Sequence, residues 1–145
     1  MIDRIWAEHY ALDWVTQWNA RDLDSLLTHY AANVVFRSPR IPVVLGTNRS
    51  FVSGIEELRA YWSKALELAK DIRFEVDSVG VGGDAVSILY RNHRGDHVAE
   101  TLLFGEDLKV VEGIVTYLAP LTSKAAERQS NPWLQLRNSP ERGIS

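Results

Sequence analysis

Apolar side chains recur at every fourth position along the first part of the chain. Five residues share this spacing: Ile2, Trp6, Tyr10, Trp14 and Trp18. Residues four apart lie on one face of an α-helix, so the spacing predicts a first helix with a broad aromatic face. Asp22 is a suitable N-cap for a second helix. The apolar face of that helix would carry Leu23, Leu26, Leu27 and Tyr30.

A short β-prone segment and a third helix are predicted next. Residues 34–38 favour a strand, which the prolines that follow would stop from continuing as a central strand. Residues 43–53 are expected to form a loop. Ser53 and Glu56 match a capping box, and apolar residues at helical spacing then predict a third helix over residues 54–69.

Beyond residue 71 the period of the apolar positions falls to two, which is typical of strands. Four strands are predicted, separated by turns rich in Gly and Asp: residues 74–79, 86–90, 97–104 and 109–118. Strands that follow one another through tight turns pair as antiparallel neighbours. The predicted fold class is therefore α+β, with three N-terminal helices and an antiparallel sheet that also receives the strand at residues 34–38.

The apolar period stops near residue 119, and the rest of the chain is polar. Trp133, Leu134 and Leu136 are the apolar residues that could anchor this tail. We therefore predict one domain over residues 1–118 and a C-terminal extension over residues 119–145. The extension is expected to be ordered and docked on the domain or on a partner subunit.

Composition and charge restrict the classes of function. Hydrophobic residues make up 46% and charged residues 24% of the 145 positions, which is typical of a globular protein, and no apolar run is long enough to span a bilayer. The net charge of −3 gives no basic surface for nucleic acid or anionic lipid. Cysteine is absent, which excludes disulfides and thiolate chemistry. We expect a cytoplasmic protein that binds a small molecule, without a nucleic acid, membrane or cofactor as partner.

Four segments carry a resemblance to a known family. Residues 18–30, which begin Trp-Asn-Ala-Arg-Asp-Leu-Asp, and the shorter segments 35–39, 54–62 and 105–113 resemble motifs of the nuclear transport factor 2-like superfamily. That superfamily includes ketosteroid isomerases and SnoaL-like polyketide cyclases. The resemblance implies a cone-shaped fold, in which a strongly bent sheet wraps around three helices and encloses an apolar pocket. It also implies a homodimer formed through the outer face of the sheet.

The resemblance to ketosteroid isomerases places three catalytic positions on this sequence. Those enzymes use a Tyr, an Asp base and a protonated Asp that donates a hydrogen bond. The matching motifs put Trp14, Ser38 and Glu100 at these positions. A serine hydroxyl is too weak a base to take a proton from carbon, so steroid isomerisation by that mechanism is not expected. The acid position, however, keeps a carboxyl group.

Glu100 is the candidate catalytic residue. It shares an apolar strand face with Val98 and Phe104, so we expect its side chain inside the cone. Loss of hydration there would raise the pKa of the carboxyl group, which suits a general acid or a hydrogen-bond donor. The alternative is a structural ion pair with an arginine such as Arg37 or Arg91.

The expected pocket lining consists of aromatic residues and one serine. The candidate ligand-binding residues are Trp14, Trp18, Tyr30, Phe36, Ser38, Trp62, Tyr90 and Tyr117. Most of the aromatic residues could equally pack the core, and Ser38 could simply end its strand. His93 and His97 flank a predicted turn, where side chains are exposed, so no metal site is expected.

Two classes of function fit these observations. The first is a small-molecule enzyme of the isomerase, cyclase, dehydratase or hydrolase type, with Glu100 as its acid and Trp14 or Tyr90 as orienting donors. The second is a non-catalytic module that binds a small apolar or amphipathic ligand, or that dimerises. Ser38 in place of a base favours the module, whereas Glu100 favours the enzyme. An open cavity with converging polar groups would favour the enzyme, and a filled interior would favour the module.

Overall fold

The first helix, α1 (Arg4–Asn19), begins where the sequence provides a cap. In the computed structural model, which describes residues 1–122, 124, 125 and 127, the carboxylate of Asp3 accepts a hydrogen bond from the backbone N–H of Trp6 at 2.8 Å. This bond satisfies one of the free N–H groups of the first turn. The face predicted from the four-residue spacing is buried. Its buried residues are Ala7, Tyr10, Ala11, Trp14 and Trp18.

Three shorter helices follow: α2 (Leu23–Leu27), α3 (Ile41–Leu45) and α4 (Ile55–Leu68). Asp22 caps α2 as predicted, but this helix ends before Tyr30, which begins a strand instead. The helix α3 begins before the loop predicted over residues 43–53 and overlaps its first residues, so the count of three helices is wrong. Pro42 is tolerated there because it lies in the first helical turn, where backbone N–H groups have no partner within the helix.

The start of α4 differs from the predicted capping box. The N-cap is Gly54, whose φ of 91° is a conformation that other residues rarely adopt, and no side chain caps the helix. The backbone N–H of Ser53 donates instead to the carboxylate of Glu57 at 2.9 Å. The first turn is therefore stabilised by Glu57 and not, as predicted, by Ser53 and Glu56.

Six strands form one curved sheet in the order β2-β1-β6-β5-β4-β3. Their bounds are β1 (Tyr30–Arg37), β2 (Phe51–Ser53), β3 (Glu75–Gly82), β4 (Ala85–Arg91), β5 (His97–Phe104) and β6 (Val110–Leu118). The strands from β3 to β6 pair as antiparallel neighbours, as predicted, and the short strand β2 pairs antiparallel with β1. The pairing of β1 with β6 is parallel, which corrects the prediction of a fully antiparallel sheet. A long connection separates these two strands, so the chain can return to β1 in the same direction.

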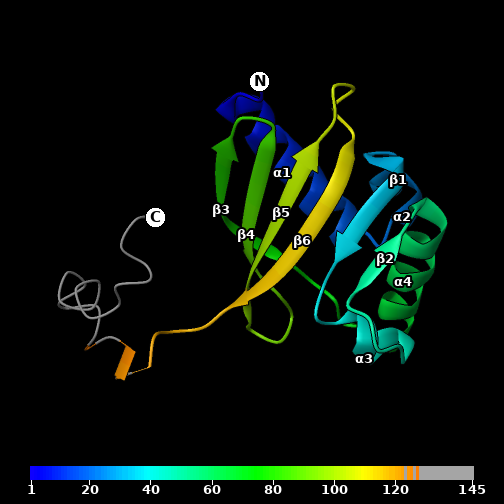
Figure 1. The fold of residues 1–145 in the computed structure, drawn as a ribbon, viewed down its shortest axis with the longest axis vertical. Coiled ribbons are helices and arrows are strands. Elements are labelled where there is room, and N and C mark those ends of the chain that lie inside the picture. Colours follow the sequence, from blue (N-terminus) through cyan, green and yellow to red (C-terminus); the bar gives the residue numbers. More distant parts are fainter. Residues whose placement is uncertain (123, 126, 128–145) are drawn as a thin grey trace, which may run out of the picture.

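The helices cover one face of this sheet. Figure 1 shows α1 crossing behind the strands from β3 to β6, while α4 lies beside β1 and β2. The helix α1 contacts β3, and α4 contacts both β1 and β2. No described helix covers the opposite face of β4, β5 and β6. The result is an α+β fold with its core between the helices and the concave face of the sheet.

Alternation along the strands directs one set of side chains at the helices. The buried residues of β5 are Val98, Glu100, Leu102 and Phe104. This pattern confirms the face that the sequence assigns to Glu100. On β6 the inward position 113 is a glycine, and a Cβ added there would lie 2.7 Å from Cδ1 of Phe36. Gly113 therefore lets the Phe36 ring lie directly against the sheet.

The predicted C-terminal extension falls mostly outside the described residues. The last strand ends at Leu118, and residues 119–122 are exposed. The expected docking of the extension through Trp133 concerns a segment beyond the described residues. Within the part of the chain that the structure describes, no helix combines the length and the apolar character needed to cross a membrane.

Candidate functional site

An open cavity of about 290 Å³ lies between the concave face of the sheet and the helices. Its exposed lining residues include Val43 of α3, Leu68 of α4 and Arg94 in the turn between β4 and β5, so the cavity opens where these segments meet. Figure 1 shows α3 and that turn at the same end of the molecule. Aromatic rings form much of the wall, namely Trp18, Phe36, Tyr61, Trp62, Phe74, Tyr90 and Tyr117.

Seven of the nine predicted site residues line this cavity. They are Trp18, Phe36, Ser38, Trp62, Tyr90, Glu100 and Tyr117. The other two, Trp14 and Tyr30, are only 0% and 4% exposed and lie behind the lining. The indole of Trp14 packs against Phe74 and Tyr90, with ring centroids 5.7 and 5.0 Å apart. Tyr30 packs against Trp62, with ring centroids 5.1 Å apart, so both residues support the wall from behind and do not form its inner surface.

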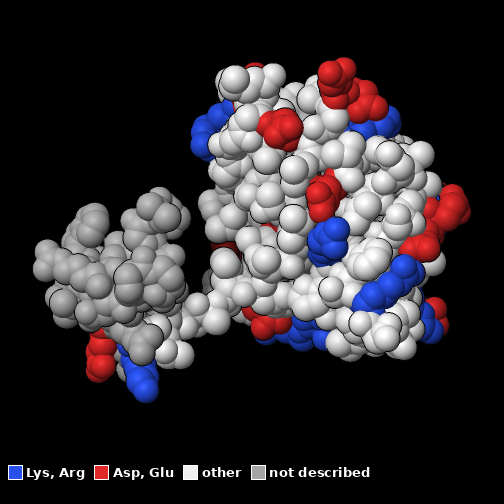
Figure 2. Space-filling model, in the orientation of Figure 1, with Lys and Arg blue, Asp and Glu red and all other residues white. Residues whose placement is uncertain are grey.

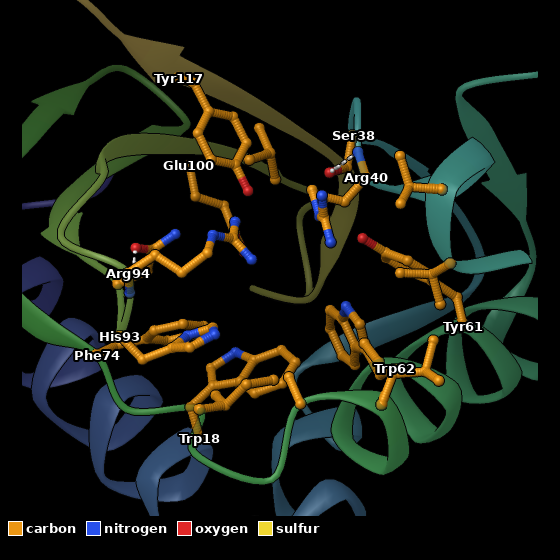
Figure 3. A pocket seen from close by; sticks show the side chains of 18 of the residues that line it. Trp18, Ser38, Arg40, Tyr61, Trp62, Phe74, His93, Arg94, Glu100 and Tyr117 are labelled. Atoms are coloured by element: carbon orange, nitrogen blue, oxygen red, sulfur yellow. Dashed lines mark hydrogen bonds between the residues drawn. The ribbon is translucent and has the colours of Figure 1, made fainter.

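Glu100 places the only carboxyl group in the described lining. Its side chain projects from β5 into the cavity, and the residue is 4% exposed (Figure 3). Burial raises the pKa of this carboxyl group from the ordinary value of 4.5 to about 8. The Trp14 indole and the Tyr90 hydroxyl lie near it and oppose part of that rise. However, Oε2 of Glu100 and Nε1 of Trp14 form no hydrogen bond of ordinary length with any described residue.

The ion pair that would make Glu100 structural is not formed. Arg37 pairs with Glu112 at 3.0 Å, and Arg91 lies 3.8 Å from Asp77. Both pairs are partly exposed, and neither involves the cavity. No described cation is paired with Glu100, and its pKa of about 8 favours the protonated form of the carboxyl group at neutral pH. It can donate a hydrogen bond to an oxygen atom in the cavity.

Ser38 has a clear backbone role at the end of β1. Its side-chain oxygen accepts a hydrogen bond from the backbone N–H of Arg40 at 3.2 Å. Its carbonyl accepts another from the N–H of Ile41 at 3.2 Å. Ser38 thereby fixes the turn that leads from β1 into α3. The hydroxyl of Tyr61 lies near Ser38. Burial raises the pKa of Tyr61 to about 12, and the hydrogen-bonding influence of Ser38 lowers that pKa by a smaller amount.

Sequence reasoning missed most of the polar lining. The missed polar residues are Arg40, Tyr61, Asn92, His93 and Arg94. Tyr61 could have been found, because it precedes Trp62 on a helix whose apolar face was predicted. Arg40 and Arg94 lie in irregular segments, where no periodicity indicates the direction of a side chain.

His93 lies in the wall between the cavity and an outer groove. Its Nε2 atom is 3.9 Å from Oδ1 of Asp71, and its Nδ1 atom is buried without a partner among the described residues. His97, which flanks the other end of the turn, faces Asp77 instead at 3.7 Å. Within residues 1–122, 124, 125 and 127, no group of three His, Cys, Asp or Glu residues is arranged to hold a metal ion.

Comparisons with known proteins agree with this architecture. The model of a family described as the SnoaL-like domain matches residues 11–122. A SnoaL-like protein of unknown function from Burkholderia thailandensis E264 is 35% identical, with a TM-score of 0.77 over 81% of this chain and 98% of that chain. A comparison with curated proteins found no match.

More distant solved structures share the fold. SalBIII, an epoxide hydrolase/cyclase-like enzyme with a role in pyran ring formation in salinomycin, has a TM-score of 0.62 and 13% identity. The match covers 81% of this chain and 95% of that chain. A protein of unknown function with a cystatin-like fold from Methylobium petroleophilum PM1 has a TM-score of 0.63 and 14% identity, covering 84% of this chain and 82% of that one. Because the family model matches residues 11–122, which is most of this chain, the chain belongs to the SnoaL-like family.

Proposed function

We propose that this protein is an enzyme that moves protons to and from a small, largely apolar organic molecule, with Glu100 as the acid. One observation carries the proposal: a buried carboxyl group with its pKa raised to about 8 lies in an open, aromatic cavity. Unpaired buried acids cost stability, so such a group is more typical of an active site than of a packed core. The cavity is open and has converging polar groups, which favours the enzyme over the binding module.

The chemistry follows from the protonation state of Glu100. A protonated carboxyl group can donate to a carbonyl or epoxide oxygen and neutralise the negative charge that develops on it. His93 lines the same cavity, and its imidazole is the base of this proposal. As His93 takes a proton from the carbon next to a carbonyl group, the C–H electron pair forms the C=C bond of an enol and the π electrons of the C=O bond move to the oxygen. The carbonyl oxygen takes the proton of Glu100.

The fold accommodates chemistry of this kind. SalBIII, which shares the fold, is described as an epoxide hydrolase/cyclase-like enzyme. Opening an epoxide places negative charge on the epoxide oxygen, which an acid such as Glu100 neutralises. This likeness supports the proposed type of reaction and leaves the substrate of this protein to experiment.

Exchange of the α-hydrogens of 2-tetralone into D2O, followed by proton NMR, tests the proposal. We expect the wild-type protein to accelerate exchange and Glu100→Gln to lose at least about 100-fold of that acceleration, since general acid–base groups contribute about 10²–10⁴. Glu112→Gln is the matched control, because Glu112 lies in an ion pair with Arg37 outside the cavity lining. Binding of 2-tetralone without exchange would favour the non-catalytic module. Equal exchange by Glu100→Gln would exclude Glu100 as the acid.

We also propose that the protein forms a homodimer through the uncovered face of β4, β5 and β6. Figure 2 shows few charged side chains across the face of the sheet that is turned away from α1. Leu89, Leu103 and Ile114 on this face are partly exposed, and Leu118 is 49% exposed. An apolar surface of this kind is stabilised when a second copy covers it.

Multi-angle light scattering at micromolar concentration should give twice the mass of the chain. Leu103→Glu should shift the mass towards the monomer, because it places a charge in the apolar face. Leu12→Glu is the matched control, since Leu12 is 58% exposed on α1, away from this face. A monomeric wild-type protein would contradict the proposed dimer.

A further inference from the structure

Two arginine side chains enter the cavity from different elements. Arg40 lies between β1 and α3, and Arg94 lies in the turn between β4 and β5. Figure 3 shows both side chains pointing into the cavity, above the rings of Trp18 and Trp62. Arginines at a surface normally extend into water, so two of them that point into an aromatic cavity require an explanation.

The guanidinium groups of these arginines are largely free. No described residue forms an ion pair or a hydrogen bond with the guanidinium group of Arg40. The contact of Arg40 with the Ser38 side chain is made by the backbone N–H of Arg40. Arg94 forms an ion pair with Asp96, to which its Nε donates at 3.2 Å, and both of its terminal nitrogens remain available. Arg37, Arg49 and Arg59 are paired with carboxylates outside the cavity lining.

The backbone positions of both arginines are fixed by buried side chains. The amide oxygen of Asn92, a buried residue, accepts from the backbone N–H groups of Arg94 and Asp96 at 3.0 and 2.9 Å. Ser38, also buried, holds the backbone N–H of Arg40 in the same manner. The two cationic side chains therefore start from ordered turns, which lowers the entropic cost of using them to bind a ligand.

The charge of the lining is one-sided. Among the described lining residues there are two arginines and one carboxyl group, Glu100, whose raised pKa favours its protonated form at neutral pH. An anionic group in the cavity would meet the free guanidinium nitrogens of both arginines, and Asp96, which pairs with Nε of Arg94, lies outside the lining. A guanidinium group binds carboxylates through paired N–H donors, so a carboxylate is the group that this arrangement fits.

We propose, on the basis of the function proposed above, that the substrate class is a flat, mainly apolar molecule that carries a carboxylate, held by Arg40 and Arg94. The rings of Trp18, Trp62 and Phe74 provide flat surfaces for the apolar body. The uncharged oxygen at the reacting centre then meets Glu100. Binding of the carboxylate by the two arginines then fixes the orientation of the molecule in the cavity.

The experiment compares two fluorescent probes that differ by one anionic group. They are 1-anilinonaphthalene-8-sulfonate and its neutral analogue N-phenyl-1-naphthylamine. We expect the wild-type protein to bind the sulfonate at least about tenfold more tightly, since the neutral probe cannot accept charge-assisted hydrogen bonds from the two guanidinium groups. We expect 2-naphthoate, but not 2-naphthamide, to displace the sulfonate probe, which extends the result to carboxylates.

Substitutions then assign the preference to the two arginines. Arg40→Gln and Arg94→Gln should each weaken sulfonate binding about fivefold or more while leaving the neutral probe within about twofold. Arg59→Gln is the matched control, because it removes the same charge from outside the cavity lining. Unchanged binding of the neutral probe shows that the Gln variants still fold. Arg40→Lys and Arg94→Lys keep the charge and should keep most of the preference for the sulfonate.

The outcomes separate this inference from the proposed reaction. Equal affinities for the two probes, unchanged binding in both Gln variants, or no binding of either probe would overturn the anionic substrate class. None of these results alters the exchange of 2-tetralone, which carries no charge. Loss of exchange in Glu100→Gln together with an intact arginine-dependent preference would support both proposals.

Discussion

Glu100→Gln should be more stable than the wild-type protein at pH 8 and about equally stable at pH 4.5. The folded protein keeps the proton of Glu100 up to a pKa of about 8, whereas the unfolded chain releases it near the ordinary value of 4.5. Between these two values the wild-type free energy of unfolding falls by about 1.4 kcal/mol per pH unit, because unfolding releases a proton. Gln has no proton to release. The advantage of the variant should therefore grow to about 5 kcal/mol at pH 8, measured by urea unfolding.

Other titrating groups cancel in this comparison. Hydrogen bonds from Ser25 lower the pKa of Asp22, and a hydrogen bond from Asn92 lowers the pKa of Asp96. The stabilisation that these two carboxylates give to the fold is lost as the pH falls, equally in the wild-type protein and in the variant. The matched control is Glu112→Gln on the partly exposed outer face, which should change stability by less than about 1 kcal/mol with no trend between pH 5 and 8. Parallel stability profiles for wild type and Glu100→Gln would mean that Glu100 is ionised in the fold, against the proposed role as acid.

Trp14→Ala should destabilise the fold by about 3–5 kcal/mol, the usual cost of removing a buried aromatic side chain. Trp14 is 0% exposed and packs against Phe74 and Tyr90, two rings that line the cavity. Its loss would leave a void directly behind the cavity wall. Guanidinium chloride unfolding, monitored by circular dichroism, measures the effect.

Leu12→Ala on the same helix is the control for this substitution. Leu12 is 58% exposed, so its truncation should change the free energy of unfolding by no more than about 0.5 kcal/mol. Trp14→Phe keeps most of the ring volume and should cost less than Trp14→Ala. A Trp14→Ala protein as stable as the wild type would show that the cavity wall does not depend on this indole.

Local alternation was sufficient to predict the direction of Glu100. Side chains of a strand alternate between two faces, so the apolar neighbours Val98 and Leu102 determined which face is buried. The same argument applies to Phe36 on β1 and to Ser38 just after it, and both line the cavity. Predictions of this kind succeed because they depend on neighbours that are two positions away in the sequence.

The rest of the site depends on contacts between distant segments. The helix α3 has only five residues, which is too short to show a helical period in the sequence, and it packs against α4. Arg40 and Arg94 lie in irregular turns, and the backbone of each turn is held by a side chain, Ser38 in the first and Asn92 in the second. The parallel pairing of β1 with β6 likewise depends on the whole chain between them. No pattern within a short window records these contacts.

The parallel pairing of β1 with β6 also determines when the cavity can form during synthesis. Ser38 and Arg40 follow β1, whereas Glu100 lies on β5, and β6 is the strand that joins these two parts of the sheet. Pairing of strands so distant in the chain carries a large loop-closure cost and forms late. A nascent chain on the ribosome therefore has no binding cavity until Val110–Leu118 has emerged, and up to that point the ends of β1 and β5 have nothing to hold them together.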